Sequence, residues 1–186
     1  YVGILLRNSF RSWTVTPEIK YRDGKNTKKT VDWFVRKAEK LIIVEVKQSS
    51  VFLETKQTGS FDRFKVDVGK TVEKGIEQLN LTESILQKGT TPELASFNGV
   101  TRIKKVCVVA DPLYFSNLLL SESLGELLST HVVNISDFED LLALQEKKEG
   151  LFYLLDQKEN DPALAPMDFK EFLIERYGKK HGAANH

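Results

Sequence analysis

Two acidic residues and a lysine stand in or near the most apolar stretch of the chain. Glu45 and Lys47 close the run LIIVEVK, residues 41–47, and Asp32 lies shortly before it. A charge in apolar surroundings costs free energy unless it is paired, solvated in a cleft or bound to a cation. Two carboxylates suit Mg²⁺ or Mn²⁺, which lower the pKa of bound water and offset charge on a phosphate. These residue types predict a metal-dependent site that hydrolyses phosphodiesters, with Lys47 neutralising a phosphate oxygen or orienting the attacking water.

The run 41–47 has the pattern of a central β-strand. Its first four residues are all apolar, which predicts burial on both faces of a sheet. Successive side chains of a strand point to opposite faces, so Glu45 and Lys47, two positions apart, share one face. The carboxylate and the ammonium are therefore expected side by side at the end of a buried strand.

A hairpin is expected to bring Asp32 to the same face. A second strand-like run, 31–35, is followed by the short polar connection 36–40, which predicts an antiparallel pair with the run after it. If the turn is centred between residues 38 and 39, Asp32 lies directly opposite Glu45, with Cβ atoms about 4.5–5.5 Å apart. A slip of one residue without a bulge would send Asp32 to the other face.

The rest of the sequence predicts an α/β fold with a mixed central β-sheet flanked by helices. Helical periodicity indicates helices, and alternation or short apolar runs bounded by turn residues indicate strands. Consecutive strands followed by β-α-β alternation are typical of a mixed sheet. Besides the hairpin we expect strands over 13–21, 105–110 and 131–135; the tail of a helix over 1–10; helices over 67–87, 114–129 and 167–177 and one from Ser136, with Ser136 and Glu139 as its capping box; and loops over 22–29 and 49–65.

Length and composition bound the class of protein. The chain has 186 residues, of which 41% are hydrophobic and 28% charged, which suits a single globular domain and excludes wholesale disorder. We place this domain at 1–177 and a flexible tail at 178–186. The single Cys excludes an internal disulfide framework and a multi-cysteine zinc site.

The sequence carries no sign of a membrane segment. No apolar run approaches the roughly 18 residues of a membrane-spanning helix, and no signal peptide is visible. We therefore expect a cytoplasmic protein with no membrane partner. Because the first residue is Tyr rather than Met, we expect a piece of a longer chain, with a homodimer or further domains of that chain as additional partners.

Charge is divided unevenly along the chain. The net charge is +1, but residues 1–105 hold 20 Lys and Arg against 12 Asp and Glu, whereas residues 106–186 hold 7 against 14. A basic half suits a polyanion-binding surface, and it equally suits charges spread over solvated faces. A local basic cluster falls in and beside the expected loop 22–29, close to the site hairpin. Its candidate nucleic-acid-binding residues are Lys20, Arg22, Lys25, Lys28 and Lys29.

The site residues and their strand context resemble the PD-(D/E)XK nuclease superfamily, which has the restriction-endonuclease-like fold. The resemblance implies a core of a helix, three strands, a helix and a strand, and residues from about 13 to 111 fit that core after its first helix. The matching residues are Val31-Asp32, Glu45-Val46-Lys47 and, on the following helix, Gln78.

The resemblance also implies a role for each of these residues. Asp32 and Glu45 correspond to the metal-binding acids, and the carbonyl of Val46 to a further metal ligand. Lys47 corresponds to the catalytic lysine. Gln78 corresponds to a polar residue that faces the metal site from the helix, and we include it among the candidate catalytic residues.

The implied activity is that of a nuclease that hydrolyses DNA with Mg²⁺ or Mn²⁺. Two alternatives stay open. One is an RNA-cleaving enzyme with the same site, because metal and phosphate contacts ignore the 2′ position. The other is a nuclease-like domain that binds nucleic acid or protein without cleaving. Many members of the family carry a Glu on the first helix, whereas this chain has no Asp or Glu before Glu18.

Overall fold

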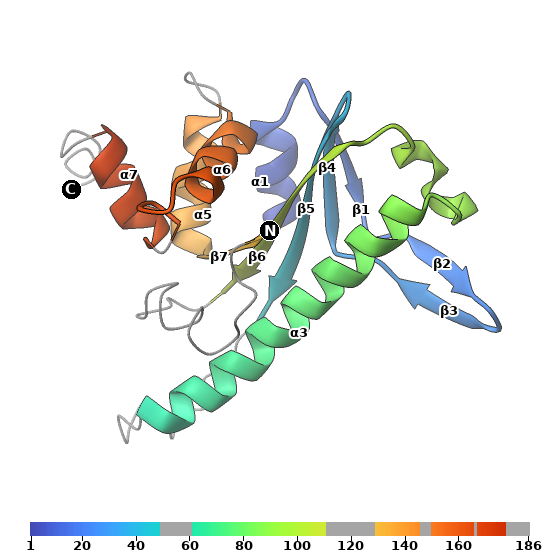
Figure 1. The fold of residues 1–186 in the computed structure, drawn as a ribbon, viewed down its shortest axis with the longest axis horizontal. Helices are drawn as coiled ribbons and strands as arrows, with labels where there is room; N and C mark the ends of the chain where they lie inside the picture. Colours follow the sequence, from blue (N-terminus) through green and yellow to red (C-terminus); the bar gives the residue numbers. More distant parts are fainter. Residues whose placement is uncertain (49–60, 111–128, 146–149, 166, 178–186) are drawn as a thin grey trace.

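The computed structural model describes residues 1–48, 61–110, 129–145, 150–165 and 167–177 (Figure 1). The expected helix 114–129 and tail 178–186 lie almost wholly outside these residues, as does most of the expected loop 49–65. The last five residues of that expected loop are helical instead, because the following helix begins at Phe61 rather than near residue 67.

Five strands form the central sheet, in the order β1-β4-β5-β6-β7. The neighbours β1, β4 and β5 are antiparallel, whereas β6 and β7 continue the sheet in parallel to β5. This confirms an α/β fold with a mixed central sheet. The strands are β1 (Thr14–Pro17), β4 (Trp33–Lys37), β5 (Lys40–Lys47), β6 (Arg102–Val109) and β7 (Thr130–Asn134).

Helices cover both faces of the sheet (Figure 1). On one face the long helix α3 and the 3₁₀-helix η1 bury Leu41 and Ile43 of β5. On the other face α1, α5, α6 and α7 bury Ile42 and Val44. The expectation of a central strand buried on both faces is therefore confirmed for β5. The helices are α1 (Val2–Ser9), α3 (Phe61–Lys88), η1 (Pro92–Phe97), α5 (Ile135–Leu144), α6 (Leu151–Asn160) and α7 (Phe169–Tyr177).

The hairpin of β4 and β5 has the expected register. A two-residue turn that starts at Ala38 joins the strands, and Ala38 adopts φ 52°, in the left-handed region that such turns use. The ladder begins with Trp33 opposite Val44. One position further along, Asp32 falls opposite Glu45, as the turn position required.

Residues 20–29 form a hairpin of their own, where the sequence predicted the end of a strand and a loop. The expected strand 13–21 stops at Pro17, because proline has no N–H to donate to a ladder. The turn begins at Gly24, with φ +61°, as the Asp-Gly pair suggested. One side chain of this hairpin, Tyr21, is buried, so there was no apolar alternation to reveal the strands. The strands are β2 (Lys20–Asp23) and β3 (Asn26–Lys29).

Two C-terminal helices begin differently from what the sequence predicted. Asn134, not Ser136, caps α5, since its side-chain oxygen accepts a hydrogen bond from the backbone N–H of Asp137 at 2.9 Å. The expected capping box of Ser136 and Glu139 is therefore wrong; Asn serves as an N-cap about as well as Ser. The sequence did not predict α6, which begins without a side-chain cap.

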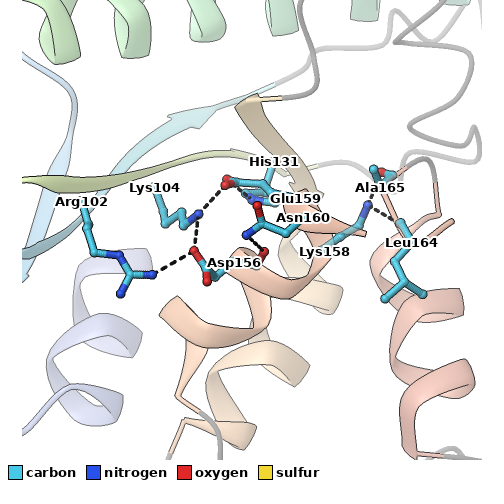
Figure 2. Close-up of polar contacts among 9 residues, drawn as sticks. All are labelled: Arg102, Lys104, His131, Asp156, Lys158, Glu159, Asn160, Leu164 and Ala165. Atoms are coloured by element: carbon cyan, nitrogen blue, oxygen red, sulfur yellow. Dashed lines mark hydrogen bonds and ion pairs between the residues drawn. The ribbon is translucent and has the colours of Figure 1, made fainter. Parts of the chain in front are cut away.

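A polar network around the buried side chains of Lys104 and His131 attaches α6 to the sheet (Figure 2). Lys104 of β6 pairs with Asp156 at 2.9 Å and with Glu159, and Arg102 bonds Asp156 at 3.0 Å. His131 Nε2 lies 2.8 Å from Glu159 Oε1. Burial lowers the pKa of His131, against the opposing effect of Glu159, so the imidazole is neutral near pH 7. Because a carboxylate accepts only, Nε2 carries the hydrogen of this bond.

Candidate active site

Asp32 and Glu45 are joined through the backbone at the C-terminal end of β5. The backbone N–H of Asp32 donates to Glu45 Oε2 at 3.2 Å, and the backbone N–H of Val46 donates to Asp32 Oδ2 at 2.8 Å. Each carboxylate thus accepts a hydrogen bond from the strand segment opposite, just beyond the ladder of β4 and β5. The structure brings together the two acids that the sequence paired.

Lys47 completes the cluster. Its Nζ lies 2.7 Å from Glu45 Oε1, and the exposed fractions of the two side chains are 25% and 8%. The alternation of β5 directs both side chains to the face that α3 covers. The acid and the lysine therefore meet beneath the helix at the end of the central strand.

A glycine of α3 makes room for Lys47. A Cβ atom on Gly75 would lie 3.3 Å from Lys47 Cγ, 3.4 Å from Lys47 Cε and 2.7 Å from Cys107 Sγ. Glycine inside a helix costs about 1 kcal/mol relative to Ala, and an isolated one commonly marks a close approach. The sequence interpretation passed over Gly75, although a glycine within a helical run was a usable signal.

Burial makes the charge of Glu45 unfavourable. It raises the pKa of this carboxyl, and the nearby charge of Asp32 raises it further, whereas Lys47 and the backbone N–H of Asp32 act in the opposite direction. Burial also raises the pKa of the Cys107 thiol to about 12. Cys107 is therefore a protonated core thiol, and among the described residues of this cluster the two acids and the lysine remain as candidates for chemistry.

The donor atoms suit a hard divalent cation. Asp32 Oδ2 and Glu45 Oε2 each accept one backbone hydrogen bond, which leaves further lone pairs on both carboxylates. The carbonyl of Val46 points to the same side of β5 as its N–H, toward Asp32. Carboxylate and carbonyl oxygens are the ligands that Mg²⁺ and Mn²⁺ prefer. In the described ranges, no group of three or more His, Cys, Asp and Glu residues could hold a metal ion.

Gln78 lies on α3, the helix that contains Gly75, and its side chain binds the β2–β3 hairpin. Its Nε2 donates to the backbone carbonyl of Lys29 at 2.8 Å, at the base of the β2–β3 hairpin. One turn further on, Thr82 is fully buried and accepts a hydrogen bond from the backbone N–H of Val31 at 3.3 Å. These two side chains bind the segment that leads into Asp32. The catalytic assignment of Gln78 stays a prediction.

The five basic candidates all lie on the β2–β3 hairpin rather than on a loop. Lys28 pairs with Asp23 of the same hairpin, and Lys29 pairs with Glu18 at 3.0 Å. Through Lys29 and Gln78, the hairpin is attached to the helix that covers Lys47.

Comparison of the chain with protein-family models, with curated proteins and with solved structures finds no match. Within the part of the chain that the structure describes, no helix is both long enough and apolar enough to cross a membrane.

Proposed function

We propose that this chain is a metal-dependent nuclease domain that hydrolyses phosphodiester bonds of DNA. The observation that carries the proposal is the pair of hydrogen bonds that links Asp32 and Glu45, with Lys47 ion-paired to the second acid. Two carboxylates held this close repel each other unless a proton or cation lies between them. A binding site for Mg²⁺ or Mn²⁺ explains why both acids are kept at a buried strand end.

The order of elements supports a restriction-endonuclease-like core. The resemblance stated above implies a helix, three strands, a helix and a strand. The chain has α1, the antiparallel strands β1, β4 and β5, then α3 and the parallel strand β6, with the β2–β3 hairpin between the first two strands. The proposed site lies at the end of the third of those strands.

Each site residue has a distinct role in the proposed reaction. Asp32, Glu45 and the carbonyl of Val46 would hold Mg²⁺ or Mn²⁺. The bound ion supplies an acidified water and offsets negative charge on the phosphate. Lys47 is not a metal ligand, since an ammonium has no acceptor. Its Nζ donates to a phosphate oxygen or to the attacking water once substrate competes for it with Glu45.

One observation favours a second function, a nuclease-like domain that binds nucleic acid or protein without cleaving. The helix α1 contains no acidic residue, whereas many members of the resembled family place a Glu there. Among the described residues the site therefore has two acids. We propose DNA as the partner of the nuclease, nucleic acid or protein as the partner of the second function, and the cytoplasm as the setting of both, with a second copy or further domains of the same chain as additional partners.

The test is cleavage of linear, circular and single-stranded DNA and of RNA, each with Mg²⁺, with Mn²⁺ and with EDTA. We expect metal-dependent cleavage of DNA by the wild type and none by Asp32→Asn. Asp140→Asn makes the same change at an exposed position of α5, on the opposite face of the sheet, and should cleave normally. Cleavage of RNA alone would overturn the assignment of DNA, and metal-dependent binding without cleavage would establish the second function instead.

A further inference from the structure

The β2–β3 hairpin is a two-stranded sheet separate from the central sheet, and it projects beside the C-terminal half of α3 (Figure 1). Each strand has four residues, which corresponds to about 13 Å of length. Residues 20–29 carry five Lys and Arg and one acid, Asp23. All of their side chains except that of Tyr21 are exposed. The hairpin is therefore a thin basic projection with almost no core of its own.

Strand pairing fixes which side chains share a face. Lys20 lies opposite Lys29, and Tyr21 lies opposite Lys28. Cross-strand partners share a face and successive residues alternate. Tyr21, with 5% of its surface exposed, marks the inner face, which packs toward the body of the protein. The outer face consequently carries Lys20, Lys29 and Arg22.

The cations of the outer face are only partly neutralised. Within the described residues Lys20 and Arg22 form no ion pair, although the backbone N–H of Arg22 donates to Glu93 Oε1 at 3.3 Å, and Lys29, which pairs with Glu18, is still 60% exposed. The inner-face Lys28, by contrast, has its ion-pair partner within the hairpin. Like charges directly opposite each other destabilise a pair of strands. A polyanion that lies along the outer face would remove that repulsion.

The base of the hairpin is fixed beside the candidate active site. Gln78 of α3 binds the carbonyl of Lys29, and Thr82 binds the N–H of Val31. From Lys29 the chain reaches Asp32 in three residues, which span at most about 11 Å. A strand of nucleic acid held by the outer face would therefore lie close to the candidate active site.

We propose that this outer face docks duplex DNA, with Lys20, Arg22 and Lys29 against phosphates and base edges of one major groove. The major groove of B-DNA, about 12 Å wide, admits a two-stranded β-ribbon, whereas that of A-form RNA is too deep and narrow. Single strands are bound largely by stacking on exposed aromatic side chains, and the one aromatic residue of this hairpin, Tyr21, is buried. The inference rests on the proposed function for the identity of the polyanion as DNA.

The test is binding in EDTA, so that cleavage plays no part. Fluorescence anisotropy is measured with a duplex DNA of about 20 base pairs, which is longer than the single major-groove contact that the hairpin would make. The double variant Lys20→Gln/Arg22→Gln removes two outer-face charges. The matched control Lys28→Gln/Lys88→Gln removes two charges from the inner face and the adjoining end of α3. All four side chains are exposed, so both variants should melt like the wild type.

We expect the outer-face variant to bind duplex DNA about tenfold more weakly or worse. The slope of log K against log[salt] should shrink by about 0.9 for each phosphate contact removed. The control should stay close to the wild type, and single-stranded DNA, duplex RNA and acidic lipid vesicles should bind the wild type more weakly than duplex DNA. Equal losses in the two double variants, or equally tight binding of any of those three competitors, would overturn the proposal. Duplex binding without metal-dependent cleavage would overturn the nuclease assignment and leave the docking surface standing.

Discussion

The backbone N–H of Val46 donates to Asp32 Oδ2 at 2.8 Å, although the half-buried side chain of Val46 packs against the core on the opposite face of the sheet. The position of a candidate metal ligand therefore depends on the register of a hairpin rather than on a side-chain contact. In a β-strand the N–H and the C=O of one residue point to the same side, so the carbonyl of Val46 also faces Asp32. One residue of the central strand thus holds an acid in place and supplies an oxygen beside it.

Asp32→Asn and Glu45→Gln should each abolish metal-dependent cleavage and leave the fold intact. Asn and Gln keep a carbonyl oxygen that accepts the backbone hydrogen bond, at nearly constant volume, but they remove the anionic ligand. Because burial raises the pKa of Glu45, its charge opposes folding, so Glu45→Gln should be at least as stable as the wild type without metal.

Thermal unfolding with and without Mg²⁺ checks this prediction. A ligand that binds only the folded state increases the free energy of unfolding by RT ln(1 + [L]/Kd) and so raises the melting temperature. The wild type should gain from Mg²⁺ and the two variants should not. Equal gains in all three proteins, or two unfolded variants, would show that these acids are not the ligands.

Lys47→Ala should keep the metal and lose most of the turnover. The ammonium lies 2.7 Å from Glu45 Oε1 and competes with a cation there, so calorimetric titration should give equal or tighter metal binding. Loss of one strong electrostatic stabiliser commonly lowers the rate about 10²–10³-fold, or roughly 2.7–4 kcal/mol. Single-turnover cleavage at saturating metal measures this step. Near-wild-type cleavage would refute the catalytic role, and joint loss of metal and activity would indicate that Lys47 holds Glu45 in place.

The central hairpin could be predicted from sequence because its determinants are local. The apolar run 41–47 indicated a central strand, and the short connection before it gave the face of Glu45 and the register of Asp32. The hairpin at 20–29 has no apolar run or apolar alternation, because solvent surrounds nearly all of it.

The contacts of α3 depend on how that helix crosses the sheet. The spacing of apolar residues in the sequence does not show this crossing. Gln78 therefore binds the carbonyl of Lys29, a partner that the sequence did not indicate. The close approach of Gly75 to Lys47 and Cys107 is a property of the same crossing.

Gly75→Ala should destabilise the protein, although Ala is the better helix former by about 1 kcal/mol. Its Cβ would lie 2.7 Å from Cys107 Sγ, and overpacking of this kind commonly costs about 1–3 kcal/mol. Cys107→Ala removes the sulfur, so the double variant should be more stable than the sum of the two single changes implies. Urea unfolding of the four proteins measures this coupling. Strictly additive effects would mean that Gly75 and Cys107 do not constrain each other.

The same four proteins test whether Gly75 positions Lys47. Once the sulfur is absent, the added methyl group still meets Lys47 Cγ and Cε at 3.3 and 3.4 Å. We therefore expect the double variant to cleave more slowly than Cys107→Ala even where their stabilities converge, with metal affinity unchanged. Equal cleavage rates in these two proteins would assign Gly75 to packing alone.

Lys158 should make the stability of the protein rise with pH just above neutrality. Its side chain is buried, and its Nζ donates to the backbone carbonyls of Leu164, at 3.1 Å, and Ala165 (Figure 2). Burial lowers the pKa of Lys158 from its ordinary value of 10.5 to about 8, partly opposed by Asp168. Between these two pH values the unfolded chain binds more protons than the folded one. The free energy of unfolding therefore increases with pH, by up to about 1.4 kcal/mol per pH unit.

Cys107 limits the pH range in which the effect of Lys158 can be measured. Burial raises the pKa of its thiol from 9.0 to about 12, so above pH 9 the unfolded chain loses this proton first, and this contribution opposes the gain in stability from Lys158. Urea unfolding from pH 8 to 9 of the wild type and of Lys158→Met separates the two effects, because Cys107 is common to both proteins. The wild type should gain stability relative to Lys158→Met across this window, since the neutral amine keeps two N–H groups for the two carbonyls while the cost of burying a charge disappears. Parallel pH profiles of the two proteins would show that Lys158 does not titrate there and that its ammonium is better compensated than its burial indicates.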